Sequence, residues 1–219
     1  MPAPLLKICG LRSDAQARAV AALGVDAVGV IGVDASPRFV HPSQRQTLFA
    51  AIQAVAPHCL GVLVVADPSD SQLDELDPRH GHQVIQLHGQ ESPKRCRELR
   101  QRLGCTVWKA VRLRQPSDLE TAAAYSEVTD ALLLDAWVPD QLGGTGHRIP
   151  MEWLAGWSPT QPWWLAGGIT AARVREVLSV LRPMGLDASS GVERAPGDKN
   201  LELVKDLVET VKETAARQD

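Results

Sequence analysis

Short apolar runs recur along the whole chain, and a segment whose apolar residues follow helical spacing comes after each of them. The runs consist mainly of Val, Ile, Leu and Ala, as in residues 27–31 and 60–65, without alternating polar positions. Uninterrupted runs of this kind are typical of parallel strands that are covered on both faces. The pattern therefore predicts an α/β fold in which buried strands alternate with helices.

Eight strand–helix units can be distinguished. We expect strands at residues 5–9, 27–31, 60–65, 84–88, 106–111, 131–135, 163–166 and 185–188. We expect helices at residues 13–23, 43–55, 69–76, 93–103, 116–124, 151–155, 170–181 and 201–215. This arrangement predicts one domain over residues 1–219, a (β/α)8 TIM barrel. An open doubly wound sheet is the alternative, but eight units in so short a chain leave little room for its usual elaborations.

Composition and charge narrow the class of protein. The formal net charge of −3 offers no basic field for nucleic acid. No apolar run approaches the ~20 residues that a membrane span needs. The first residues do not resemble a signal peptide, and the four cysteines form no Cys-x-x-Cys pair, so we expect a cytoplasmic protein. No spacing of His, Asp or Glu resembles a metal site, so we expect no metal.

Glycines and serines follow the last two predicted strands. In TIM barrels, the loops after strands seven and eight often bind phosphate together with the N-terminus of a short helix. Gly167 and Gly168 follow the seventh strand, and Ser189, Ser190 and Gly191 follow the eighth. Glycine lets backbone N–H groups approach an anion closely, although such residues also occur simply because a turn is tight. We expect a phosphate site here.

A further glycine-rich segment, with Gly143 and Gly144, lies in the long loop after the sixth strand. It is either a flexible turn or a mobile lid with additional donors beside the phosphate.

A thiol and a carboxyl end the first and sixth strands. Cys9 and Asp135 are thus candidates for the two groups that a proton-transfer reaction on a sugar phosphate needs. An ordinary thiol is only ~3% thiolate at pH 7, and a nearby cation, Lys7 or Arg38, would increase that fraction. The alternatives are a buried inert thiol and an Asp135 that forms a salt bridge with Lys7 or Lys109.

Arg38 and the histidines are less clear from the sequence. The planar fork of Arg38, in the loop after the second strand, suits a carboxylate or phosphate, and a solvated loop arginine is the alternative. His88 is either catalytic or bonded to the loop backbone. His80 and His82 are expected at the surface.

Taken in order, these motifs resemble the phosphoribosylanthranilate isomerase family, barrel enzymes of tryptophan biosynthesis. The resemblance rests on Lys7-Ile8-Cys9-Gly10, Ser36-Pro37-Arg38, Gln86-Leu87-His88-Gly89, Leu134-Asp135, Gly143-Gly144-Thr145-Gly146, Leu165-Ala166-Gly167-Gly168, Ser189-Ser190-Gly191-Val192-Glu193 and Gly197-Asp198-Lys199. It implies an Amadori rearrangement of N-(5-phosphoribosyl)anthranilate, with a small phosphosugar as substrate and no cofactor.

The resemblance also implies residue roles. The cysteine matching Cys9 acts as general base and the aspartate matching Asp135 as general acid. The arginine matching Arg38 holds the anthranilate carboxylate, and the glycine-rich loops hold the phosphate. Asp187 is a second contact near the sugar or its amine, and Lys7 and His88 join the substrate-binding set.

The chain departs from the family pattern at two places. Residues 30–35 read Val-Ile-Gly-Val-Asp-Ala where the family usually carries phenylalanine, and Arg173 stands where it often has asparagine.

Two other functions remain as alternatives. A related isomerase of a histidine-pathway aminoaldose usually has aspartate where Cys9 stands. A non-catalytic phosphosugar-binding barrel would keep the glycine-rich loops without needing Cys9 and Asp135 together. The sequence is compatible with a monomer or a homodimer.

Overall fold

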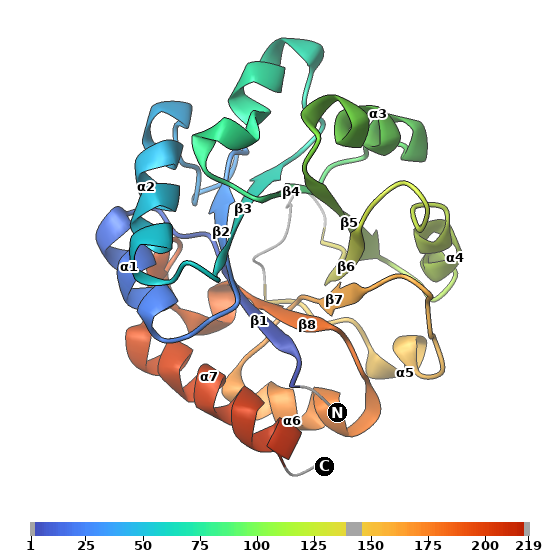
Figure 1. The fold of residues 1–219 in the computed structure, drawn as a ribbon. Coiled ribbons are helices and arrows are strands. Elements are labelled where there is room, and N and C mark those ends of the chain that lie inside the picture. The colour runs from blue at the N-terminus through green and yellow to red at the C-terminus, as the bar shows by residue number, and fades with distance from the viewer. Residues whose placement is uncertain (1–2, 139–145, 217–219) are drawn as a thin grey trace.

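Eight parallel strands close into a barrel in the computed structural model, which describes residues 3–138 and 146–216 (Figure 1). The strands are β1 (Leu5–Cys9), β2 (Ala27–Ile31), β3 (Leu60–Val65), β4 (Val84–Leu87), β5 (Thr106–Leu113), β6 (Ala131–Ala136), β7 (Trp163–Leu165) and β8 (Gly185–Ala188). Each strand pairs with its successor, and β1 also pairs with β8, where Lys7 lies opposite Asp187. The predicted TIM barrel is confirmed, and only β5 differs from its expected bounds by more than one residue.

Helices surround the barrel, as the sequence predicts (Figure 1). The α-helices are α1 (Asp14–Ala22), α2 (Pro42–Val55), α3 (Pro93–Leu103), α4 (Asp118–Ala123), α5 (Met151–Leu154), α6 (Ala171–Val180) and α7 (Leu201–Ala216). Side chains fix several helix starts: Ser13, Ser92 and Thr170 each accept a hydrogen bond from a backbone N–H of the first turn.

Two connections differ from the expected elements. The helix expected at 69–76 is the 3₁₀ helix η1 (Asp70–Leu76), followed by η2 (Pro78–His80). Only Leu76 in η1 is buried, so the segment lacks the apolar face that stabilises an α-helix by packing. After β8 come the 3₁₀ helix η3 (Ser190–Val192) and an antiparallel pair, β9 (Glu193–Ala195) with β10 (Asp198–Lys199), which the sequence did not predict.

His82 is buried, so its expected surface position was wrong. Its side chain is only 2% exposed, its Nε2 lies 3.1 Å from the carbonyl oxygen of Leu76, and its ring packs on Phe49 of α2. Burial lowers the pKa of His82 to about 4. The polar sequence around it gave no sign that the 3₁₀ turns fold back against α2.

Large side chains fill the barrel interior. Trp108 and Trp164 pack with ring centroids 4.7 Å apart, and Trp164 is fully buried. Gly185 makes room for them, since a Cβ there would lie 2.3 Å from the Trp164 ring. The barrel is therefore a packed core rather than a pore.

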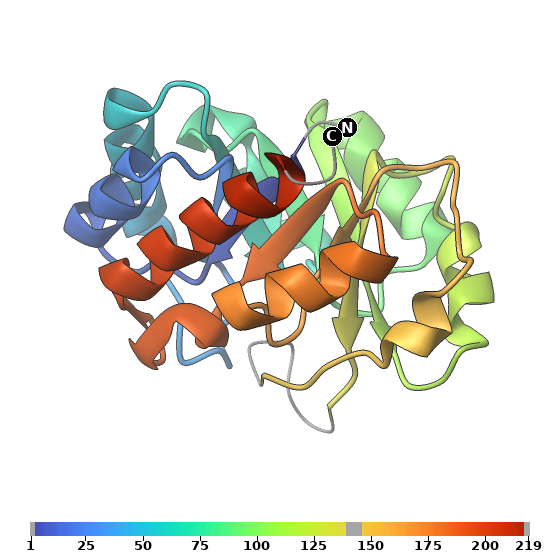
Figure 2. The same ribbon diagram turned by 90° about the horizontal axis from the view of Figure 1, so that it is seen from below.

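The loops that follow the strands gather at the end of the barrel to which the strand arrows point (Figure 2). The residues expected to carry chemistry follow β1, β2, β4, β6, β7 and β8, so the fold brings them to this one end. The predicted lid residues Gly143 and Gly144 lie outside the described residues.

Candidate active site

A cavity of about 470 Å³ opens at the C-terminal end of the barrel. Among the residues lining it are nine that the sequence predicted: Cys9, Arg38, His88, Asp135, Gly167, Gly168, Asp187, Ser189 and Ser190. Two predicted residues do not line it. Lys7 is fully buried, and Gly191 packs against the loop after β7, where a Cβ would lie 2.2 Å from the carbonyl oxygen of Ile169.

Cys9 lies above a buried ion pair. Lys7, two residues earlier on β1, donates from Nζ to Oδ1 of Asp187 on β8 at 3.0 Å. Burial alone would lower the pKa of Lys7, but Asp187 and the Cys9 sulfur outweigh burial and raise it. Lys7 is therefore a fixed positive charge beneath the thiol, and its carboxylate partner is Asp187 rather than Asp135.

The Cys9 thiol is harder to ionise than an ordinary thiol. Burial raises its pKa, and the Lys7 ammonium opposes that rise only in part. The cation that the sequence suggested is present, but burial destabilises the thiolate more than Lys7 stabilises it. Gly29 of β2 leaves space for the sulfur, because a Cβ at that position would lie 2.6 Å from Sγ.

The remaining cysteines are inert thiols. Burial raises the pKa of Cys59 to about 12 and those of Cys96 and Cys105 to about 11. Cys59 and Cys96 are buried, whereas Cys105 is half-buried.

Asp135 lies at the far side of the cavity from the β1 end, beside His88. Oδ2 of Asp135 lies 3.5 Å from Nε2 of His88, and its Oδ1 accepts a hydrogen bond from the Ala136 N–H. The Gln86 side chain holds the other ring nitrogen of His88 at 2.9 Å. When the Gln86 amide donates to Nδ1, the ring proton sits on Nε2 and faces the carboxyl of Asp135. His88 thus bonds a side chain and not the loop backbone.

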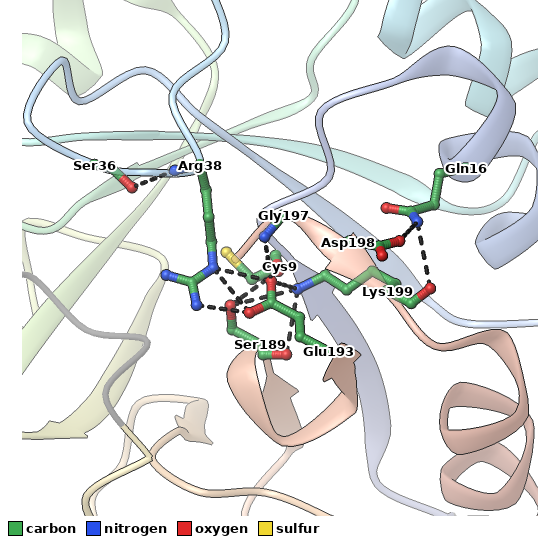
Figure 3. Close-up of polar contacts among 9 residues, drawn as sticks. All are labelled: Cys9, Gln16, Ser36, Arg38, Ser189, Glu193, Gly197, Asp198 and Lys199. Carbon is green, nitrogen blue, oxygen red and sulfur yellow. Dashed lines mark hydrogen bonds and ion pairs between the residues drawn. The ribbon is translucent and has the colours of Figure 1, made fainter. Parts of the chain in front are cut away.

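Arg38 is buried and belongs to a charged cluster with Glu193 and Lys199 (Figure 3). Arg38 donates from Nε and Nη2 to the Glu193 carboxylate, the latter at 2.6 Å, and Lys199 donates to the same carboxylate at 2.7 Å. Burial acts to raise the pKa of Glu193, but the two cations outweigh it and lower that pKa. One carboxylate between two cations leaves the cluster with a net positive charge beside Cys9.

The loops after β7 and β8 line the same cavity. Gly167 and Gly168 both have positive φ, 86° and 63°, which only glycine adopts readily. The Ser189 hydroxyl donates to the carbonyl oxygen of Cys9 at 3.0 Å and so ties the loop after β8 to the end of β1. Gly167, Gly168, Ser189 and Ser190 present small donors to one side of the cavity.

Four residues of the site carried no role in the sequence interpretation: Gln86, Glu193, Lys199 and Gly29. The charges of Glu193 and Lys199 in a glycine-rich stretch after the last strand were a signal, but their pairing with Arg38 depends on β9 and β10. Gly29 lies within an apolar run, and nothing in the sequence indicates its contact with Cys9.

Lys109 does not reach Asp135. Its Nζ donates to Oε2 of Glu91 at 2.7 Å and to the carbonyl oxygen of Gly89 at 2.8 Å, so it fixes the loop after β4. Within residues 3–138 and 146–216, no group of three His, Cys, Asp or Glu could hold a metal ion, and no helix is long and apolar enough to cross a membrane.

The fold and the site define the chain as an enzyme of the TIM-barrel class with thiol and carboxyl groups over one cavity. Residues 6–210 match the family model described as N-(5'phosphoribosyl)anthranilate (PRA) isomerase. Proteins named N-(5'-phosphoribosyl)anthranilate isomerase from Synechocystis and Nostoc punctiforme are 44% and 43% identical, covering 92% and 93% of this chain and 93% and 96% of theirs. The chain belongs to the phosphoribosylanthranilate isomerase family.

Solved structures agree. The phosphoribosyl anthranilate isomerase of Thermus thermophilus superimposes with a TM-score of 0.80 at 33% identity, over 95% of this chain and 98% of that one. The Thermotoga maritima enzyme gives 0.85 at 27% identity, over 96% and 99%. A further isomerase structure, in complex with reduced 1-(o-carboxyphenylamino)-1-deoxyribulose 5-phosphate, gives 0.83 at 26%, over 96% and 99%. The expected family membership is confirmed.

Proposed function

We propose that Cys9 and Asp135 share the acid–base chemistry by which this isomerase converts N-(5-phosphoribosyl)anthranilate into the corresponding 1-deoxyribulose 5-phosphate in tryptophan biosynthesis. The observation that carries the assignment is that a thiol on β1 and a carboxyl on β6 line one cavity beside the loops after β7 and β8. Each group by itself has a structural explanation, whereas a shared cavity gives both a function.

Two anchors orient the substrate. The phosphate binds at the small donors of Gly167, Gly168, Ser189 and Ser190, where backbone N–H groups and hydroxyls suit an anion. The anthranilate carboxylate binds near Arg38, where the net positive charge of the cluster attracts it. Since Glu193 already occupies Nε and Nη2 of Arg38, the substrate carboxylate meets a guanidinium held in one orientation.

The first step opens the furanose ring. Asp135 donates a proton to the ring oxygen, the bond from C1′ to that oxygen breaks, and the lone pair of the anthranilate nitrogen forms the C1′–N double bond. A protonated Schiff base results. His88, 3.5 Å from Oδ2 of Asp135, stabilises the carboxylate that remains.

The second step removes the proton on C2′. Cys9 acts in the form that has released its proton to solvent, and the new iminium charge near the sulfur, together with Lys7, increases the fraction of that thiolate. The thiolate takes the C2′ proton, and the electrons of that C–H bond form the C1′–C2′ double bond while the nitrogen becomes neutral. The enolamine then tautomerises: C1′ gains a proton, the C2′ hydroxyl loses one, and the ketone forms.

An assay with N-(5-phosphoribosyl)anthranilate, followed by its fluorescence, tests the proposal. We expect turnover by the wild type and a decrease in kcat of at least ~10²-fold in Cys9→Ser and in Asp135→Asn, the typical effect of a positioned acid or base. Cys105→Ser, which alters a half-buried thiol before β5, is the matched control and should keep wild-type activity.

Two results would contradict the proposal. If the wild-type protein shows no turnover, the proposed activity is wrong. If turnover is unchanged in both variants, the roles of Cys9 and Asp135 are wrong, but the substrate assignment stands. Preferential turnover of the histidine-pathway aminoaldose would favour the alternative isomerase.

We further propose one catalytic domain over residues 1–219 that works in the cytoplasm as a monomer or homodimer. Free thiols at all four cysteines support a reducing compartment. A similar structure is of monomers derived from the dimeric enzyme of Thermotoga maritima. Sedimentation equilibrium measures the assembly, and any oligomer larger than a dimer would contradict this.

A further inference from the structure

Arg173 lies behind the proposed phosphate loop, in the first turn of α6, with only 4% of its surface exposed. Its Nη1 donates to the carbonyl oxygen of Gly167 at 2.7 Å and its Nη2 to that of Ile149 at 3.3 Å. The guanidinium thus joins the loop after β7 to the segment that follows β6.

Among the buried lysines and arginines of residues 3–138 and 146–216, Arg173 differs from the others in its lack of a carboxylate. Lys7, Lys109 and Lys199 pair with Asp187, Glu91 and Glu193, and Arg38 and Arg45 pair with Glu193 and Glu75. For Arg173, the described residues provide no carboxylate within 4 Å, only the two carbonyl oxygens. A buried cation without an anion is costly, so this position calls for a negative charge from elsewhere.

The surroundings of Arg173 reinforce that demand. Burial lowers the pKa of Arg173, and the neighbouring guanidinium of Arg148 lowers it further, while the carboxylate of Glu176 offsets this only in part. Arg148 also lies over the loop, since a Cβ on Gly168 would come within 3.1 Å of its Cγ. An anion bound at the loop would relieve the repulsion between the two arginines.

The hydrogen bond to Gly167 also directs a donor. The peptide between Gly167 and Gly168 is trans, so its carbonyl and the Gly168 N–H point in opposite directions. Arg173, which bonds that carbonyl, is not among the described residues that line the cavity, whereas Gly167 and Gly168 are. In the described part of the chain, the Gly168 N–H donates no hydrogen bond. The Gly168 N–H is therefore available to donate a hydrogen bond to a ligand.

We propose that Arg173 is a positioning residue of the phosphate site, which fixes the Gly167–Gly168 peptide so that its N–H binds the phosphoryl group and supplies the positive charge behind it. This inference rests on the proposed function for the identity of the phosphate ester, but phosphate binding itself is measurable without turnover. The positive charge depends on arginine at position 173, because a neutral side chain there would not supply it.

Calorimetric titration of the purified protein with inorganic phosphate tests the role of Arg173. We expect Arg173→Met to raise the Kd for phosphate at least ~10-fold, because it removes both the charge and the hydrogen bonds. Arg173→Lys keeps the charge but loses the fork, so its Kd should stay within ~3-fold of the wild type. Arg175→Met, on the same helix but exposed, is the matched control and should leave the Kd unchanged.

Kinetics provide a second readout. Because the phosphate does not react, we expect Arg173→Met to raise KM about as much as the phosphate Kd and to change kcat less than ~3-fold. Should Arg173→Met fail to fold, as judged by circular dichroism, Arg173→Gln replaces it in both measurements.

Three outcomes would overturn the inference: a wild type that does not bind phosphate, an Arg173→Met protein with the wild-type Kd, or an Arg173→Lys protein damaged as much as Arg173→Met. Equal damage in Arg173→Lys and Arg173→Met would mean that the guanidinium of Arg173 only ties the two loops together and that its charge does not contribute to binding. A wild type that binds phosphate but does not turn over the isomerase substrate would contradict the proposed function and leave the role of Arg173 intact.

Discussion

At the scale of single residues, the absence of a side chain on Gly29 leaves the space that the Cys9 sulfur occupies. The position of Cys9 at the end of β1 was evident from the sequence, because a reactive residue followed an apolar run. The close approach of Gly29 to the Cys9 sulfur was not evident from the sequence, because this contact joins two strands and depends on their register. Pairings such as Lys7 with Asp187 were hidden for the same reason.

Gly29→Ala should separate the position of the thiol from the stability of the barrel. A methyl group 2.6 Å from Sγ must displace the sulfur, and a displacement of about 1 Å can reduce the rate ~10²-fold. We expect kcat to fall by that order. Gly61→Ala is the matched control on β3, since its methyl group meets Phe49 outside the barrel; it should lower the urea midpoint but keep kcat. Equal kcat in both variants would show that the thiol needs no such space.

At the scale of elements, the strands were more predictable than their connections. Uninterrupted apolar runs mark strands covered on both faces, and capping residues such as Ser13 mark helix starts. The 3₁₀ turns η1 and η2 carry little apolar pattern, so neither their geometry nor the burial of His82 could be inferred. His82 is buried there because its ring packs on Phe49 of α2, and that contact does not appear in a local pattern.

His82 should make stability depend on pH. Its pKa is about 4 in the folded protein and near 6.5 when unfolded, so the unfolded chain binds the proton more readily and acid destabilises the fold. Between pH 7.5 and 5, we expect a loss of about 2 kcal/mol from this group. Urea unfolding of the wild type and of His82→Gln at both pH values measures it; the variant should lose this part of the pH dependence. His58→Gln, at an exposed histidine, should retain it.

At the scale of the whole molecule, the site exists only where the ends of several strands meet. The sequence predicted the barrel because eight units recur at a regular spacing, and it predicted the end of the barrel that carries the chemistry because the reactive residues follow the strands. It could not predict that Glu193 holds Arg38, because that contact depends on the β9–β10 turn folding back over the cavity.

Ligand binding should therefore stabilise the entire barrel. Reduced 1-(o-carboxyphenylamino)-1-deoxyribulose 5-phosphate, which a similar isomerase binds, would contact the ends of β1, β6, β7 and β8 together. At a free concentration 100 times its Kd, it should raise the free energy of unfolding by about 2.7 kcal/mol. Urea titration measures the shift. Anthranilate at the same concentration lacks the phosphate and should shift the midpoint less; an equal shift would mean that the phosphate loops do not take part.

The pairing of β1 with β8 joins the barrel strand that is synthesised first to the one that is synthesised last. β1 leaves the ribosome long before β8, so its lysine emerges without the aspartate that neutralises it in the closed barrel. Until residue 187 is free to fold, burying Lys7 is electrostatically unfavourable, and the strand that carries the thiol has no reason to settle into the interior. The interior position of β1, with Cys9 at its end, is therefore completed only when the eighth barrel strand joins the first.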